Sequence, residues 1–300
     1  MFKNRSKWPS RTHQFSCLAR ARQIGTIPHL HAKTLGDSQN PLHVAIVHKE
    51  LKESGVLKIS LGFYDDKSEY LRQLVVHLSS KHGHGLPITH SASRGWFWDV
   101  RPQLLQIKKD VAKQARSETM DEFPWHTDCA YEHSPPRYFA LHILQPDNCG
   151  GGTLSILSSD RVRALLSPAA RFALTQPEYC IKVPPEFLKK EDEKHIIGSV
   201  LSAESNQTHT QIRLRLDITS GLSTKSRAAL EELQGILSGT KVQECTIHLT
   251  PVSLHRGTII LLDNRRWLHS RNTVKDPNRH LRRVRWDSQP FGTIESQQLD

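Results

Sequence analysis

The sequence predicts an α+β domain with a mainly β core, arranged as a closed barrel or jelly roll with flanking helices. Seven short strand-like segments lie between residues 138 and 286, each bounded by Pro, Gly, Asn or Asp. Helical periodicity dominates only before residue 84, so helices and strands do not alternate as they do around a parallel sheet. Hydrophobic residues make up 37% of the 300-residue chain, which is enough for a packed core.

The first patterned region predicts a helix, a strand and a second helix. The first helix begins at Pro41 and ends at Gly55, because apolar residues recur near helical spacing between them. Apolar and polar residues alternate over residues 57–61, which predicts a strand. Ser68 precedes the second helix, which stops near the glycines at 83–85. Its apolar stripe consists of Leu71, Leu74, Val75 and Leu78.

The remaining chain predicts mostly strands, interrupted by two helices. The strands are expected at Tyr138–Gln145, Thr153–Leu157, Tyr179–Val183, Gln211–Asp217, Glu244–Leu249, Gly257–Leu262 and Leu281–Trp286. The helices are expected from about Asp160 and from about Thr224, and both residues are candidate N-caps. Residues 186–210 are polar and charged, which predicts a long loop or lid.

Charge and hydropathy exclude some classes of protein and favour others. Apolar runs never exceed four residues, whereas a transmembrane helix needs about 20, so no membrane span is expected. The net charge of +11 favours acidic partners such as a carboxylate or phosphate metabolite, nucleic acid or an anionic surface. Nucleic acid is disfavoured, because the basic residues are spread along the chain without interleaved aromatic residues.

The composition divides the chain into a basic N-terminal extension over 1–40, a single domain over 41–290 and a tail over 291–300. Residues 1–36 contain seven basic residues and no acid, which is typical both of a mitochondrial transit peptide and of a basic tail. The five cysteines are widely spaced and odd in number, so we expect free thiols in a reducing compartment. The cytoplasm is therefore the expected location, with the mitochondrial matrix as the alternative. The sequence leaves the oligomeric state open.

Two distant segments carry residues suited to one metal site. Residues two apart on a strand point to the same face, so His126 and Asp128 could hold one ion together. His269 follows Asp128 by 141 residues, so a late strand of a barrel would have to bring it beside the first pair. Asp263 and Asn264 are expected to shape the turn that presents His269. Two imidazoles and one carboxylate form the triad of non-haem iron oxygenases, which leaves coordination positions open.

Arginines beyond His269 suit a dicarboxylate cofactor. Arg283 follows His269 by fourteen residues, and one face of the predicted strand carries Arg279, Leu281, Arg283 and Arg285. A metal with open positions can chelate one end of a keto acid, while an arginine receives the far carboxylate with two hydrogen bonds. The cofactor implied is 2-oxoglutarate.

Four motifs occur together in this chain: His126-Thr-Asp128, Gly150-Gly-Gly-Thr153, Asp263-Asn-Arg-Arg-x-x-His269 and Arg279-x-x-x-Arg283-Val. The set resembles the clavaminate synthase-like, TauD/TfdA-type Fe(II)/2-oxoglutarate-dependent dioxygenases, over residues 41–287. The resemblance implies a double-stranded β-helix core and the iron ligands His126, Asp128 and His269. It implies that Arg283 anchors the distal carboxylate of 2-oxoglutarate, assisted by the hydroxyl of Thr153. Arg279 is a second candidate near the cofactor, although it could instead contact an anionic substrate or be a surface cation.

The resemblance also implies the reaction. It implies an oxidoreductase that hydroxylates, desaturates or cyclises a small molecule, with O2 as co-substrate and succinate as a product. The expected substrate is an amino acid, another carboxylate or a natural-product intermediate, anionic or zwitterionic. Two alternatives remain: the same chemistry on nucleic acid or a protein side chain, and a non-catalytic binding protein on a degenerate barrel. The sequence does not identify the substrate, because loops build the substrate walls and loops vary.

Overall fold

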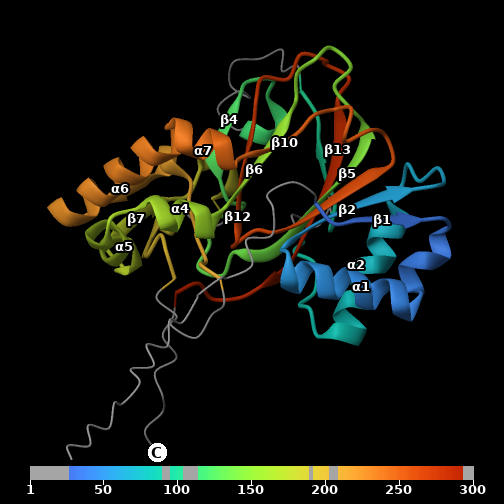
Figure 1. Ribbon diagram of the computed structural model, residues 1–300, viewed down its shortest axis with the longest axis horizontal. Helices are drawn as coiled ribbons and strands as arrows, with labels where there is room; N and C mark the ends of the chain where they lie inside the picture. Colours follow the sequence, from blue (N-terminus) through green and yellow to red (C-terminus); the bar gives the residue numbers. More distant parts are fainter. Residues whose placement is uncertain (1–26, 90–94, 104–113, 189–191, 203–208, 293–300) are drawn as a thin grey trace, which may run out of the picture.

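The computed structural model describes residues 27–89, 95–103, 114–188, 192–202 and 209–292. In these residues two β-sheets pack face to face through a shared hydrophobic cluster. Helices α1 (Pro41–Glu53) and α2 (Glu69–His82) cover the outer face of one sheet (Figure 1). The outer face of the other sheet is covered by a second lobe, formed by helices and strands between residues 159 and 245. The fold is therefore mixed α and β with mainly β sheets, as the sequence predicts.

The larger sheet has six strands in the order β1-β2-β11-β5-β13-β3. They are β1 (His29–Ala32), β2 (Val56–Leu61), β3 (Trp98–Val100), β5 (Pro136–Gln145), β11 (Thr258–Asp263) and β13 (His280–Ser288). Neighbouring strands are antiparallel, except that β1 runs parallel to β2. Because side chains alternate along a strand, Phe139 and Leu141 of β5 face the second sheet, while Tyr138 and Ala140 face the helices.

The smaller sheet has four antiparallel strands in the order β10-β6-β12-β4. They are β4 (Phe123–His126), β6 (Leu154–Ser158), β10 (Ile247–Leu249) and β12 (Trp267–Arg271). The register places His269 opposite both His126 and Ile156. Directly paired residues project to the same face of a sheet, and Ile156 belongs to the cluster between the sheets. Both imidazoles therefore project into the space between the sheets.

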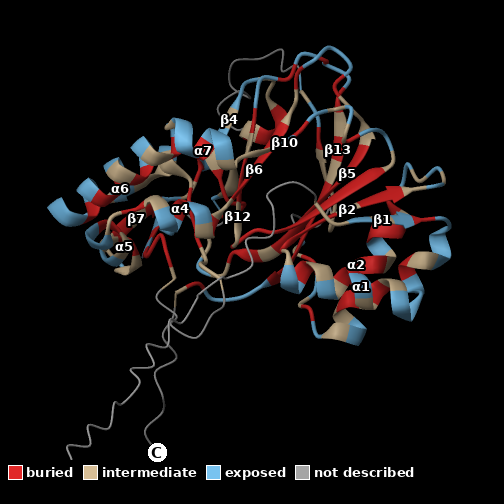
Figure 2. Cartoon of the chain, in the orientation of Figure 1, coloured by how far each residue is buried: buried red, intermediate tan, exposed pale blue. Residues whose placement is uncertain are grey.

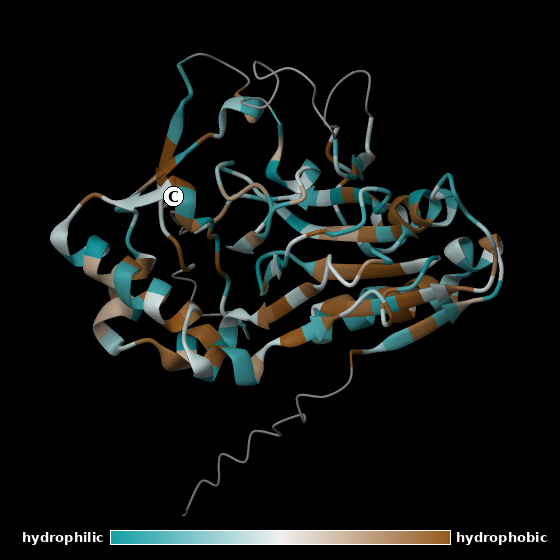
Figure 3. Cartoon of the chain, turned by 90° about the horizontal axis from the view of Figure 1, so that it is seen from above, coloured by the Kyte–Doolittle hydropathy of each residue, from teal (hydrophilic) through white to brown (hydrophobic). Residues whose placement is uncertain are grey.

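The outer faces of the sheets are covered by two separate hydrophobic clusters. Leu51 and Leu74 of the first two helices pack with Ile59 and Trp286 of the larger sheet. Figure 2 shows that α1 and α2 each carry both buried and exposed residues. The second lobe packs on Leu157 and Leu268 of the smaller sheet. Figure 3 shows hydrophobic residues alternating with polar ones along the strands. The lobe contains a three-stranded sheet in the order β8-β7-β9, formed by β7 (Tyr179–Lys182), β8 (His195–Gly198) and β9 (Thr219–Gly221). Its helices are α4 (Ser159–Leu165), α5 (Pro168–Thr175), α6 (Thr224–Leu237) and α7 (Thr240–Cys245).

Short 3-10 helices connect these elements. They are η1 (Leu35–Gln39), η2 (Arg116–Glu118), η3 (Pro185–Phe187) and η4 (Leu216–Ile218). Among the described residues, none of the helices has both the length and the apolar character needed to cross a bilayer. The four cysteines within the described ranges are free thiols, as expected.

Most of the predicted elements occur where the sequence places them, but two predicted strands differ. Residues Gln211–Asp217 do not form the predicted strand, because Ile212 and Arg215 make isolated bridges to two different partners, Leu201 and His126. The predicted strand from Glu244 begins only at Ile247, since α7 continues to Cys245 around the buried Val242. Periodicity cannot distinguish these cases, because the partner that receives the backbone hydrogen bonds is distant in sequence.

The predicted N-caps are each displaced. Ser158 is the N-cap of α4, and Asp160 instead accepts the N–H of Thr210 at 2.7 Å from within the first turn. Ser223 is the N-cap of α6, where its hydroxyl accepts the N–H of Ser226. Thr224 therefore begins the helix rather than capping it.

The expected boundaries of the domain also change. Strand β1 pairs with β2 and places Ala32 in the core, so the fold includes part of the predicted 1–40 extension. The predicted loop over 186–210 contains strand β8, which pairs with β7. Phe291 of the predicted tail is buried against Arg213. Residues 1–26, 189–191, 203–208 and 293–300 lie outside the described residues, so the transit-peptide and lid hypotheses stay predictions.

Buried histidines make stability sensitive to acid. His142 is 1% exposed and hydrogen-bonds to the Ser68 hydroxyl at 2.8 Å, and burial lowers its pKa to about 4. An unfolded histidine has a pKa near 6.5, so the unfolded chain binds the proton first as the pH falls. We expect the free energy of unfolding, measured with urea, to decrease from pH 6.5 to pH 4. His142→Gln should remove on the order of 3 kcal/mol of this decrease.

The control is His255→Gln at an exposed position, which should keep the native pH dependence. Parallel pH profiles for the native protein and His142→Gln would contradict the assignment.

Candidate metal centre

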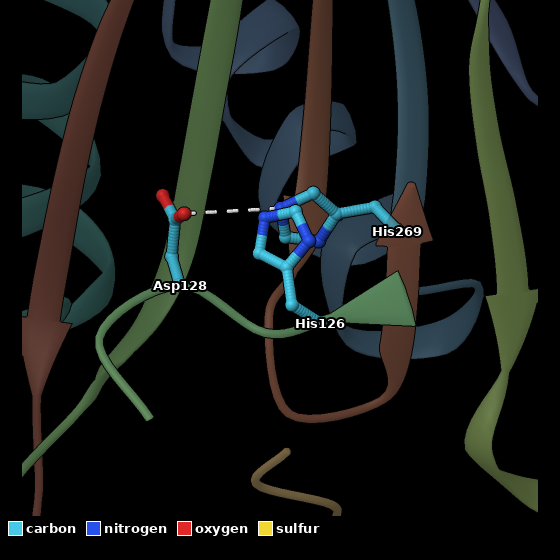
Figure 4. Close-up of side chains that lie close together, drawn as sticks. All are labelled: His126, Asp128 and His269. Atoms are coloured by element: carbon cyan, nitrogen blue, oxygen red, sulfur yellow. Dashed lines mark ion pairs between the residues drawn. The ribbon is translucent and has the colours of Figure 1, made fainter. Parts of the chain in front are cut away.

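His126, Asp128 and His269 converge between the two sheets (Figure 4). One potential ligand atom from each residue lies within 4.8 Å of the other two, and all three residues are buried. His126 ends β4, and His269 lies opposite it on β12. No other such group of His, Cys, Asp or Glu occurs in the part of the chain that the structure describes. The structure thus brings together the three residues that the sequence analysis selected.

Asp128 reaches the two imidazoles from a turn and not from a strand. Strand β4 ends at His126, and the N–H of Thr127 donates to the carbonyl oxygen of Leu214 at 2.7 Å. The chain then turns at Cys129, whose φ is +56°. The expectation that His126 and Asp128 share one strand face is therefore wrong, because the strand stops before the carboxylate.

Asn264 fixes the backbone of Asp128. Its side-chain Oδ1 accepts the N–H of Asp128 at 2.7 Å, and its Nδ2 donates to the carbonyl oxygens of Asp128 at 3.0 Å and Pro136 at 2.9 Å. Asn264 is 1% exposed and precedes His269 by five residues in the β11–β12 turn. One buried side chain therefore connects the turn that carries His269 to the turn that carries the carboxylate. The sequence predicts the role of Asn264 only in the turn that carries His269.

His126 is oriented and kept neutral by its surroundings. Its Nδ1 donates to the carbonyl oxygen of Pro124 at 2.7 Å, which leaves Nε2 as the atom available to a metal. Burial, followed by the neighbouring His269, lowers the pKa of His126 well below its usual value. The Phe123 ring stacks on His126 with centroids 3.6 Å apart, and Phe139 lies 4.6 Å from the His269 ring. A neutral, oriented imidazole is the form that binds metals.

Asp128 is ionised and incompletely partnered. Burial alone raises its pKa, but the Arg283 guanidinium and His269 reverse this and hold the pKa well below its usual range. Arg283 Nη1 donates to Oδ1 at 3.1 Å, and His269 Nε2 lies 3.8 Å from the same oxygen. The other oxygen, Oδ2, is buried and has no hydrogen-bond partner among the described residues. A buried anionic oxygen without a partner is costly, so this donor set suits a divalent cation.

Arg279 lies in the interior beside Gly152 and is not a surface cation. It is 5% exposed, and a Cβ at Gly152 would stand 3.0 Å from its Nε. Gly152 also has a φ of +66°, which favours glycine. The Arg279 guanidinium has no hydrogen-bond or salt-bridge partner in the described ranges, and burial lowers its pKa to about 9. Arg279 therefore offers a buried position for an anion, beside the turn that leads from Gly152 to Thr153.

A cavity lies beside the triad. Its wall includes His126, Asp128 and Arg283, and also Arg215, which sequence analysis placed on a strand without a role. Arg215 precedes η4 and its backbone bridges to His126. No sequence signal identifies Arg215, since it follows His126 by 89 residues and only tertiary packing joins the two.

Residues 89–285 match the model of the family described as taurine catabolism dioxygenase TauD, TfdA family. The chain belongs to the TauD, TfdA family. The family consists of Fe(II)- and 2-oxoglutarate-dependent oxygenases, so the expected enzyme class and both expected cofactors are confirmed. A comparison with curated proteins gives no match.

Solved structures share the fold of this TauD/TfdA-family chain. Asparagine oxygenase in complex with Fe(II), 2S,3S-3-hydroxyasparagine and succinate has a TM-score of 0.65 and 17% identity, covering 86% of this chain and 92% of that chain. The non-heme iron oxygenase OrfP in complex with Fe and alpha-ketoglutaric acid has a TM-score of 0.64 and 18% identity, covering 88% and 95%. OrfP with Fe, succinate and (3R,4R)-dihydroxy-L-Arg has a TM-score of 0.63 and 17% identity, covering 86% and 93%.

The Asn264 contact predicts an effect on metal binding. We expect Asn264→Ala to weaken Fe(II) binding by about 10- to 100-fold, because the Asp128 backbone loses its two hydrogen bonds to this side chain. Anaerobic calorimetric titration with Fe(II) measures the affinity, and circular dichroism checks the fold. Asn278→Ala, at an exposed position, is the control and should bind Fe(II) normally. Unchanged affinity in a folded Asn264→Ala protein would exclude this role.

Proposed function

We propose that this chain is an oxygenase that hydroxylates a C–H bond of a small anionic molecule, an amino acid or a related carboxylate. His126, Asp128 and His269 are the proposed Fe(II) ligands, and the two facing sheets are the proposed double-stranded β-helix. The observation that carries the proposal is the convergence of these three side chains, with a partnerless carboxylate oxygen, in a TauD/TfdA-family chain.

Bound Fe(II) and 2-oxoglutarate would supply the oxidising power. One atom of O2 would enter succinate as 2-oxoglutarate loses CO2, and the other would enter the C–H bond of the substrate. The residues of the chain supply the geometry. Neutral His126 and ionised Asp128 are already in the protonation states that bind a cation. All three proposed ligand side chains are buried between the sheets, and burial strengthens electrostatic interactions there.

For the distal carboxylate of 2-oxoglutarate we propose Arg279 with Thr153, in place of Arg283. A buried guanidinium without an acidic partner requires an anion, and Arg279 fits that description. Arg283 already donates to Asp128 and lies in the cavity wall. Arg283 is therefore the proposed contact for an anionic group of the substrate.

Two further observations support a small substrate. The cavity beside the triad is a small recess between the two sheets, whereas a nucleic acid requires an extended basic groove. The similar structures contain 2S,3S-3-hydroxyasparagine and (3R,4R)-dihydroxy-L-Arg, which are hydroxylated amino acids. We therefore favour a free amino acid or a carboxylate of similar size.

The proposal is tested by anaerobic titration of the protein with Fe(II) and 2-oxoglutarate. We expect the weak visible charge-transfer band of the chelate to appear in the native protein. His126→Ala should abolish the band, because one of the three donors is lost. His255→Ala, at an exposed position, is the matched control and should retain the band. Absence of the band from the native protein would refute the proposed function.

The same titration separates the roles of the two arginines. We expect Arg279→Gln to raise the Kd of 2-oxoglutarate by roughly 30-fold, equivalent to about 2 kcal/mol for lost charge-assisted hydrogen bonds. Arg283→Gln should change this Kd far less, because Arg283 is assigned to the substrate. Arg256→Gln, an exposed control, should bind 2-oxoglutarate as the native protein does. A large loss of 2-oxoglutarate affinity in Arg283→Gln with none in Arg279→Gln would show that Arg283, and not Arg279, binds the distal carboxylate.

A further inference from the structure

The wall of the cavity beside the triad is strongly cationic. Its described lining contains four arginines, Arg116, Arg215, Arg283 and Arg285, and one carboxylate, that of Asp128. This inference rests on the proposed function, in which the carboxylate of Asp128 binds the iron. Apart from Asp128, the described lining of the cavity contains no carboxylate.

The arginines approach the cavity from two different parts of the fold. Arg283 and Arg285 lie on β13 of the larger sheet, where Arg283 contacts Asp128 and Arg285 contacts Cys129. Arg215 lies beside His126, since its backbone bridges to that residue. Its guanidinium carbon is 5.5 Å from the centre of the Phe123 ring, which stacks on His126. The cavity therefore has one cationic position on the Asp128 side and another on the His126 side.

The position on the His126 side carries a net positive charge. Arg215 donates to both oxygens of Asp217, from Nε and Nη2 at 3.0 Å each, and Arg116 Nη1 contacts the same carboxylate at 3.4 Å. Two guanidinium groups thus share one carboxylate, which is 43% exposed and does not line the cavity. Arg215 is only 12% exposed, and its Nη1 has no partner among the described residues. A mostly buried cation with an available donor favours an anion.

We propose that the cavity binds a substrate with two anionic groups, as in a dicarboxylic amino acid. One group is held at Arg283 and the second at Arg215 and Arg116. The second group is a carboxylate or an anion of similar chemistry, such as a sulfonate or a phosphate. A neutral amide in its place has the same shape but lacks the charge that two guanidinium groups would recognise. Arg215 and Arg116 are therefore specificity-determining residues.

The test uses pairs of amino acids that differ only in this charge. The anaerobic protein loaded with Fe(II) and 2-oxoglutarate is titrated by calorimetry with L-aspartate against L-asparagine, and with L-glutamate against L-glutamine. We expect at least one acid to bind about tenfold or more tightly than its amide, which corresponds to about 1.4 kcal/mol. Cysteate and O-phosphoserine, added in the same way, distinguish a carboxylate from a sulfonate or phosphate as the second group.

Arg215→Gln should reduce the acid-to-amide ratio towards one, and Arg116→Gln provides a second variant at a more exposed position. Arg256→Gln, distant from the triad beside Tyr64, is the charge-matched control and should keep the native ratio.

Equal binding within both pairs, no binding of either acid, or an unchanged ratio in the folded Arg215→Gln and Arg116→Gln proteins would overturn the inference. The charge-transfer band is recorded on the same samples: a native protein with the band but without acid preference refutes this inference alone, whereas a missing band refutes the proposed function.

Discussion

The site depends on one buried carboxylate. Asp128 is buried between two sheets, and a charge in such a place is stable only when it is compensated. Arg283 and His269 engage one of its oxygens and leave the other without a partner in the described ranges. Asn264 holds the backbone of the same residue from both sides. The surrounding fold thus fixes an ionised carboxylate beside two imidazoles, which is an arrangement that a divalent cation completes.

The two sheets and the second lobe make different contributions to this arrangement. The antiparallel register of β4 and β12 aligns the two histidines, because directly paired residues share a face. The larger sheet supplies arginines from β13 on the opposite wall. The segment that leads from the lobe to η4 brings Arg215 beside His126. The metal ligands therefore come from the packed sheets, whereas part of the cavity wall comes from a connecting segment, as is usual for residues that determine specificity.

Local patterns were sufficient for elements that bury one continuous face. The helices over 41–53 and 69–82 and the strands β2, β5, β11 and β13 of the larger sheet lie where apolar spacing predicts them. Patterns failed where the backbone partner is distant. Residues 211–217 alternate as a strand does, but they bridge to Leu201 and to His126 in turn, so no ladder forms. Ser158 and Ser223 became N-caps in place of their neighbours, because the exact residue depends on the angle at which the chain enters the helix.

The sequence by itself determined the kinds of residue available for the chemistry: two histidines and an aspartate in ordered motifs, and arginines on a late strand. It could do so because ligand types and strand periodicity are local properties. Only the tertiary structure decided that Asp128 stands on a turn, that Arg279 is buried beside Gly152, and that Arg283 contacts the carboxylate. Burial and charge compensation arise from contacts between segments more than 100 residues apart, and these contacts are absent from any local stretch of sequence.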